Sequence, residues 1–205
     1  MYTLHGRAGS GSFVAEAALS MAGTPFTKVD VKRGPPDEAF RKISPLGLVP
    51  VLTLPDGNSI TESAAICILI AELYPAAALA PAPGSPDRAQ FLRWMLFMSS
   101  VLYPAVLRFF YAERYATTPT GIEEVRQSAL AESDRAFLIL EEALENRDWL
   151  VGERQSIADV YLLMLGCWHP VNDRLRDEWT RLVRHATSLK QLPELAALNV
   201  SHRLW

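Results

Sequence analysis

The segment from Pro75 to Pro86, PAAALAPAPGSP, divides the chain into two parts with different sequence patterns. A run rich in proline, alanine, glycine and serine is typical of a linker. Before this segment, short β-type runs alternate with short helical runs, whereas only helical patterns follow it. We therefore predict an α+β domain at residues 1–76, a linker at 77–86 and an all-helical domain at 87–205.

The first part has the element order βαβαββα. Two β-type runs flank the first helical run, and parallel strands need a crossover of this length. The turn Pro55-Asp56-Gly57-Asn58 separates two further β-type runs, which predicts an antiparallel hairpin. Ser63 is a good N-cap for the last helix. We predict strands at 2–5, 26–31, 49–54 and 59–61, and helices at 13–21, 37–43 and 63–73.

The second part contains only helical patterns. One of them, at 156–168, is almost entirely apolar, which predicts a helix buried on all sides. Pro104 should kink the first long helix. We predict helices at 87–115, 121–146, 156–168 and 173–187, and one after Pro193.

Charge and composition exclude several classes of function. A net charge of -3 and an isoelectric point of about 5.8 argue against a nucleic-acid partner. We find neither a signal-peptide pattern nor the roughly 18 apolar residues of a membrane span. The two cysteines, Cys67 and Cys167, lie in apolar segments and argue against a disulfide framework, so we predict a reducing cytoplasm. No Cys or His pair has metal-ligand spacing, so we predict no metal.

The sequence Gly9-Ser10-Gly11 between a strand and a helix suggests a dinucleotide-binding loop, with Asp30 at the position of a ribose-binding acid. The third glycine of that fingerprint allows the helix to pack closely on the strand, and Val14 occupies its position. The predicted hairpin also replaces the parallel strand that a dinucleotide fold requires. These two departures argue against a nucleotide site.

Three short motifs occur in the order and spacing of one family. They are Ser44-Pro45-Leu46-Gly47-Leu48-Val49-Pro50-Val51-Leu52, Ile60-Thr61-Glu62-Ser63-Ala64-Ala65-Ile66 and Gly152-Glu153-Arg154-Gln155-Ser156-Ile157-Ala158-Asp159-Val160. They are similar to the NPxGxVPxL, hxESxAI and GxxxSxAD segments of glutathione transferases. The chain thus resembles that family over nearly its whole length. The resemblance implies a thioredoxin-like first domain and an all-α helical-bundle second domain.

The first two motifs imply a glutathione site. In the family the Val-Pro bond is cis and the valine backbone pairs with the cysteinyl part of glutathione, a form of strand addition. The serine and the helix start hold the γ-glutamyl carboxylate, and the glutamate meets the ammonium group. An ordinary proline at a strand start and a plain helix cap are the structural alternatives. The predicted glutathione-binding residues are Lys32, Leu48, Val49, Pro50, Glu62 and Ser63.

The third motif predicts a structural element rather than a chemical one. Ser156 should cap the buried helix, while Asp159 returns to the Ser156 backbone N–H, as in a capping box.

Within the family the chain looks most like the bacterial beta class, because Arg93-Trp94-Met95-Leu96-Phe97-Met98-Ser99-Ser100 resembles the RWLNFISSE segment of that class. The class cysteine and histidine are missing, since Gly11 and Tyr103 occupy their positions. Mixed-disulfide chemistry on an active-site cysteine is therefore excluded.

The remaining chemistry is activation of the glutathione thiol. A free thiol with a pKa of about 8.5 is mostly protonated at pH 7, and a helix start or a hydroxyl donor favours the thiolate. We predict Ser10 as this donor and Ser12 as the second candidate, although Ser12 is also well placed to cap the first helix. Arg7 could add positive potential or be a surface residue.

The electrophile should bind between the domains, where small-molecule pockets are common. Tyr103, Phe110 and Arg114 fall on about one face of the first long helix, with Leu107 between them. Together with Arg7 they form the predicted electrophile site, with Tyr103 as a hydroxyl donor. The alternative is that the aromatic residues belong to the core of the bundle.

We predict a glutathione transferase that attacks small apolar electrophiles and forms a cytoplasmic homodimer, as the resemblance implies. Two alternatives stay open. One is a binding or regulatory protein that keeps the fold without conjugating activity, and the other is a glutathione-dependent isomerase.

Overall fold

The computed structural model describes residues 1–170 and 178–205. By its internal contacts the chain divides into two compact units, one of Met1–Ser85 with Gln191–Trp205 and one of Pro86–Lys190. Residues 191–205, which follow the helical unit in sequence, thus group with the first unit. The domain limits given above stay a prediction.

A four-stranded mixed sheet forms the centre of the first unit, with the strand order β2-β1-β3-β4. β1 pairs with β2 in parallel and with β3 in antiparallel orientation, and β3 forms an antiparallel hairpin with β4. These pairings confirm the predicted βαβ unit and hairpin. The strands are β1 (Tyr2–Gly6), β2 (Phe26–Asp30), β3 (Val51–Thr53) and β4 (Ser59–Ile60).

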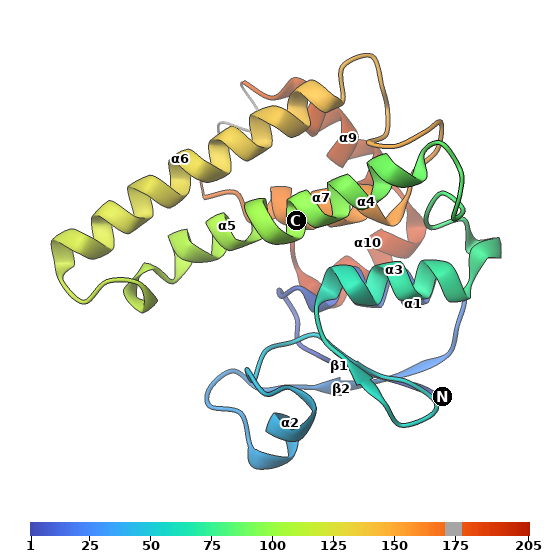
Figure 1. The fold of residues 1–205 in the computed structure, drawn as a ribbon, viewed down its shortest axis with the longest axis horizontal. Helices are drawn as coiled ribbons and strands as arrows, with labels where there is room; N and C mark the ends of the chain where they lie inside the picture. Colours follow the sequence, from blue (N-terminus) through green and yellow to red (C-terminus); the bar gives the residue numbers. More distant parts are fainter. Residues whose placement is uncertain (171–177) are drawn as a thin grey trace. The chain divides into compact units, whose positions relative to one another are not determined.

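Helices cover both faces of this sheet. α1 and α3 lie over one face and α2 lies on the other (Figure 1). Alternate residues of β1 are buried, as the two-residue period of a strand dictates, and Leu4 is fully buried together with Phe13 and Ile66. The helices are α1 (Ser12–Met21), α2 (Glu38–Ile43), α3 (Ser63–Leu73) and α10 (Pro193–His202), with a 3-10 turn at Pro75–Ala77. The thioredoxin-like first part is thus confirmed.

All regular elements of the second unit are helices, with no strand among its described residues, which confirms the predicted all-α part. α5 packs along α6, and α7 packs against α9 (Figure 1). The helices are α4 (Arg88–Phe97), α5 (Tyr103–Phe110), α6 (Pro119–Ala143), α7 (Ile157–Cys167) and α9 (Thr180–Lys190). The start of the helix predicted at 173–187 lies outside the described residues. No helix in the described ranges combines the length and the apolar character needed to cross a membrane.

The helix predicted at 87–115 is wrong at its far end, because it ends at Phe110 rather than Tyr115. A π-helical turn at Met98–Leu102 joins α4 to α5, next to the predicted kink. This turn has a local cause, because Pro104 cannot donate a backbone hydrogen bond. The Tyr103 N–H bonds to the Met98 carbonyl, which widens the helix by one residue just before the proline.

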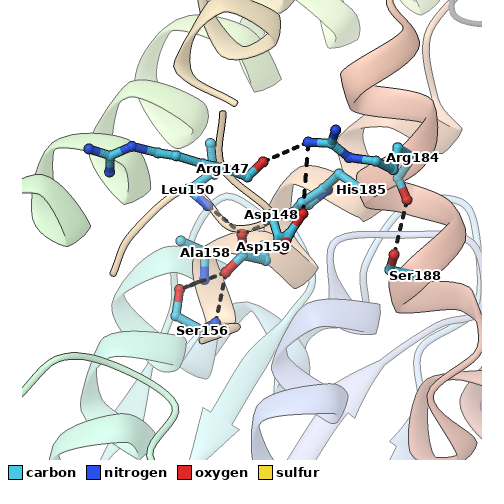
Figure 2. Close-up of polar contacts among 9 residues, drawn as sticks. All are labelled: Arg147, Asp148, Leu150, Ser156, Ala158, Asp159, Arg184, His185 and Ser188. Atoms are coloured by element: carbon cyan, nitrogen blue, oxygen red, sulfur yellow. Dashed lines mark hydrogen bonds and ion pairs between the residues drawn. The ribbon is translucent and has the colours of Figure 1, made fainter. Parts of the chain in front are cut away.

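The capping box at the start of α7 is confirmed, and Asp159 does more than cap. Its Oδ2 accepts hydrogen bonds from Ser156 N at 2.7 Å and Ser156 Oγ at 3.1 Å (Figure 2). Its Oδ1 accepts from Leu150 N and lies against His185 Nε2 of α9, both at 2.9 Å. Asp159 is fully buried. It therefore ties α7 to the preceding loop and to α9.

Candidate functional site

The sheet register gathers the predicted residues of the first unit at one end of the sheet. His5 pairs with Val51, and Leu52 pairs with Ile60, both in antiparallel register. The chain just after β1, just before β3 and just after β4 therefore meets at the same end. Because β2 runs parallel to β1, the chain that leaves β2 joins them. The residues at this end are Arg7, Ser10, Ser12, Lys32, Leu48, Val49, Pro50, Glu62 and Ser63.

The loop before α1 is held by its two serine hydroxyls. Ser10 Oγ lies 2.7 Å from the Arg7 carbonyl, to which it donates, and accepts from Ser12 N at 3.2 Å. Ser12 Oγ accepts from Arg7 N at 3.3 Å and lies 3.0 Å from Ser10 Oγ. The loop is thus fixed by hydrogen bonds between near neighbours.

The prediction that Ser12 caps α1 is wrong. The N-cap residue is Gly11, and Ser12 is the first residue of the helix and fully buried. Ser12 packs inward because Gly6 leaves room for it: a Cβ on Gly6 would lie 2.7 Å from Ser12 Cβ and Oγ. The hydroxyl that accepts a backbone N–H at the helix start belongs to half-buried Ser10.

Arg7 presents a buried donor at this loop. Its Nε has no hydrogen-bond partner among the described residues. An unmet buried donor costs about 1–3 kcal/mol, and more when the group is charged. An anionic acceptor bound beside the loop would satisfy it.

The Val49-Pro50 peptide bond is cis, as predicted. Ser44 Oγ donates to the Leu48 carbonyl at 2.8 Å and accepts from Leu48 N at 3.0 Å, which holds the loop just before this bond. Neither backbone polar group of Val49 has a hydrogen-bond partner within the described chain. The Val49 backbone can therefore pair with an added extended peptide.

Glu62 is the N-cap residue of α3, so the prediction that Ser63 is the N-cap is wrong. Glu62 has φ 65° and ψ 105°, and its own side chain makes no cap hydrogen bond. Ser63 is the first helical residue and is buried, whereas Glu62 is exposed. A positive φ at a residue with a side chain costs on the order of 1–3 kcal/mol and is most often found at functional sites. This conformation turns the chain directly into the helix.

Lys32 lines a cavity of about 580 Å³ between β2 and α2. Most of the lining residues are apolar and come from β2, α2 and the chain between them, among them Val29, Phe40 and Ile43. His5 faces the same space, and partial burial lowers the pKa of its imidazole.

Tyr103, in the helical unit, lies among aromatic residues. Its ring centroid is 5.5 Å from that of Trp168 and 6.4 Å from that of Tyr161. Such packing agrees with the alternative given above, in which Tyr103 is an aromatic residue of the bundle core.

The single helix face predicted for the electrophile site is wrong at its far end, because α5 ends at Phe110. Arg114 lies in the following 3-10 turn, and its guanidinium stacks 4.0 Å from the centre of the Tyr111 ring. Leu107 and Phe110 are exposed on α5. Their role in binding an electrophile stays a prediction.

Both cysteines are free thiols, with Cys67 buried and Cys167 partly buried, and the loss of contact with water makes each poorly reactive. Burial raises the pKa of the Cys167 thiol to about 11 and that of Cys67 further. Cys67 Sγ also donates to the Val14 carbonyl at 3.6 Å.

We expect iodoacetamide at pH 7 to label Cys167 of the folded protein about a hundredfold more slowly than an ordinary cysteine, because its thiolate fraction is lower by that factor. Cys67 should react more slowly still. Mass spectrometry of timed samples measures both rates, with the guanidinium-unfolded chain as control. Labelling of the folded protein at the unfolded rate would contradict the burial of these thiols.

Comparisons with known proteins match both parts of the chain to the same family. Residues 4–81 match the family model of the glutathione S-transferase N-terminal domain, and residues 93–192 match that of the C-terminal domain. The GST-like protein YncG of Escherichia coli K12 is 29% identical over 95% of both chains. The disulfide-bond oxidoreductase YfcG of the same strain is 32% identical, over 82% of this chain and 74% of the relative. A sphingomonad glutathione S-transferase, solved in complex with glutathione, is 28% identical with a TM-score of 0.83, over 99% of this chain and 100% of the relative.

Proposed function

The chain belongs to the glutathione S-transferase family, and on this premise we propose that it binds glutathione at the gathered end of the sheet and activates its thiol. The observation that carries the proposal is the Val49 backbone, which has no hydrogen-bond partner within the described chain and lies beside the loop before α1 and the start of α3. A peptide that pairs with Val49 would bring its thiol towards the loop before α1 and its amino-terminal end towards the start of α3. The complex of the sphingomonad relative with glutathione supports this choice of ligand.

Each part of glutathione has a matching partner in this arrangement. The cysteinyl backbone pairs with Val49, next to the exposed side chain of Leu48. The γ-glutamyl carboxylate binds at the start of α3 beside Ser63, and Glu62 accepts from the ammonium group. Lys32 offers a cation to the remaining carboxylate.

Ser10 is the residue we assign to thiol activation. Of the two loop serines only Ser10 has exposed surface, so a bound sulfur can reach its hydroxyl. The Ser10 hydroxyl turns from the Arg7 carbonyl and donates to the sulfur of glutathione. The positive end of α1 and the Arg7 guanidinium also favour the thiolate over the thiol. The thiol loses its proton to water, the thiolate attacks an electrophilic carbon, a C–S bond forms, and the leaving group departs with its electron pair.

We expect Ser10→Ala to raise the pKa of bound glutathione by about one unit and to lower kcat more than it weakens binding. A hydrogen bond to an anion is worth about 1.5–3 kcal/mol, and giving up the neutral bond to the Arg7 carbonyl offsets about 0.5–1.5 kcal/mol of this. Thiolate absorbance followed against pH measures the shift.

Ser12→Ala is the matched control and should leave that titration nearly unchanged. If Ser12→Ala moved the titration and Ser10→Ala did not, the two roles would be reversed. If neither variant moved it, the backbone N–H groups at the start of α1 would act alone.

The electrophile is proposed to be small and mainly apolar. In the helical unit, Leu107 and Phe110 expose apolar surface on α5, and Tyr103 carries a hydroxyl that could polarise a leaving group or carbonyl. Arg114 is the predicted cation of that unit, and Arg7 is the predicted cation of the first unit.

Reduction of disulfides by glutathione is the second candidate, favoured by the 32% identity to the oxidoreductase YfcG. Cys67 is buried, Cys167 is partly buried, and both thiols have raised pKa values, so we propose that the exchanging thiols come from glutathione itself.

Retention on immobilised glutathione, followed by turnover of aryl halides, enones, peroxides and a small disulfide, tests these proposals. Binding with turnover of the first two substrate types supports conjugation. Binding without any turnover supports the non-catalytic alternative, and no binding rejects the proposed site.

We propose a homodimer in the cytoplasm, where glutathione and free thiols persist. Light scattering at micromolar concentration should give twice the chain mass of 22.8 kDa. A single chain mass at that concentration would reject the dimer.

A further inference from the structure

The segment of residues 191–205 packs on the helix that begins at the thiol-activating loop. α10 lies beside α1 in the first unit (Figure 1). His202, the last residue of α10, places its Nε2 2.8 Å from Glu16 Oε2 in α1. Lys28 of β2 holds the same oxygen at 2.5 Å. Glu16 and His202 are both buried, so α1 is tied to α10 by a pair shielded from water.

A second set of contacts reaches the loop itself. Phe13, the second residue of α1, meets the rings of His202 and Trp205 edge-on, at centroid distances of 5.3 Å and 5.8 Å. A Cβ on Gly9 would lie 3.7 Å from the His202 carbonyl. Asn199 Oδ1 accepts from the backbone N of Trp205 at 3.3 Å, which fixes the segment after α10. Residues 202–205 therefore contact the chain on both sides of Ser10.

Within the described residues, the His202 ring makes one polar contact, the one with Glu16. Its Nδ1 is buried without a partner among the described residues, so Nε2 carries the proton that it donates to Glu16. Burial alone would raise the pKa of the Glu16 carboxyl, but the hydrogen bonds from His202 and Lys28 outweigh burial and hold that pKa below its ordinary value. Without the His202 bond, the carboxylate would keep only Lys28 in a buried site.

We infer that His202 is a positioning residue for thiol activation, and that it acts through its hydrogen bond to Glu16. The inference rests on the proposed function. Glu16 lies about one helical turn after Ser12, a rise of roughly 6 Å. If Glu16 loses its partner and moves towards water, it carries the first turn of α1 and the adjoining loop with it. A misplacement of about 1 Å at a reacting group reduces rates by up to a hundredfold.

Two variants of His202 separate the hydrogen bond from general packing. Glutamine can place its amide nitrogen near the Nε2 position and keep the bond, whereas asparagine is too short to reach Glu16. Both are polar and smaller than histidine, so they differ mainly in the contact at issue. His169→Asn is the control, because the fully buried side chain of His169 places its Nε2 2.9 Å from Asp134 Oδ1 in the other unit.

We expect His202→Asn to raise the pKa of bound glutathione by about one unit and to lower kcat about tenfold, with the KM for glutathione changed less than twofold. His202→Gln should stay within about twofold of the wild type. His169→Asn should lower the melting temperature without shifting the thiol titration. Hydrogen exchange of residues 7–21 without ligand should accelerate in His202→Asn alone.

Equal losses in the asparagine and glutamine variants would overturn the inference, because ring packing would then be the cause. An unchanged titration in His202→Asn would also overturn it. If His202→Asn does not fold, Trp205→Ala takes its place. It removes a partly exposed contact with Phe13 and should shift the titration in the same direction by a smaller amount, and no shift would again reject the inference.

Failure of the proposed function would look different. A wild-type protein that binds no glutathione, or never forms its thiolate, rejects the proposed function whatever the variants do. A normal wild-type titration that His202→Asn leaves in place rejects only the role of His202.

Discussion

Replacing Asp159 by alanine is expected to lower the free energy of unfolding by about 3–5 kcal/mol, because it leaves several buried donors unsatisfied at about 1–3 kcal/mol each. A capping box alone contributes about 0.5–2 kcal/mol. The larger value follows because the carboxylate is fully buried and also joins Leu150 and His185. Its removal leaves the donors of Ser156, Leu150 and His185 buried without an acceptor. Urea unfolding measures the loss.

Asp148→Ala is the matched control for this variant. Asp148 lies in the same region, 3.9 Å from Arg184, but its side chain is 81% exposed (Figure 2). We expect a change within about 0.5 kcal/mol. At urea concentrations below its unfolding transition, the Asp159→Ala variant should still bind glutathione. A variant that lost glutathione binding at an unchanged melting temperature would show that Asp159 is not a structural residue.

Replacing Glu62 by alanine is expected to weaken glutathione binding by about 1.5–3 kcal/mol, the range for a hydrogen bond to a charged group. Glu62→Gly should weaken binding as much, but it should raise the free energy of unfolding by about 1 kcal/mol, because glycine adopts a positive φ without strain. Calorimetric titration and urea unfolding measure the two effects separately.

Glu72→Ala, at the other end of α3, is the control and should leave glutathione binding unchanged. If Glu62→Gly were less stable than Glu62→Ala, the positive φ at Glu62 would not be a source of strain. If both bound glutathione like the wild type, Glu62 would have no part in the site.

Structural features that depend on a few neighbouring residues could be predicted from the sequence. The hairpin follows from its Pro-Asp-Gly turn, the capping box from Ser156 and Asp159, and the cis bond at Pro50 from the motif around it. Each depends on residues only a few positions apart. The same motifs located the end of the sheet where the candidate site lies.

Features that depend on distant residues could not be predicted. The pair of Glu16 and His202 joins positions 186 apart, and no local pattern marks it. The place of Ser12 depends on the space that Gly6 leaves under it. The positive φ at Glu62 is a conformation that its own sequence disfavours. The surrounding fold imposes all three.

The first unit is discontinuous in sequence, with consequences for the order of folding. Its two segments, Met1–Ser85 and Gln191–Trp205, are separated by the whole of the second unit, whose residues are contiguous. Contacts between distant segments form late, because the chain between them must first be closed into a loop. During synthesis the helical unit can complete its contacts first. We therefore expect α1 to gain its final support only after the helical unit has folded and α10 can pack against α1.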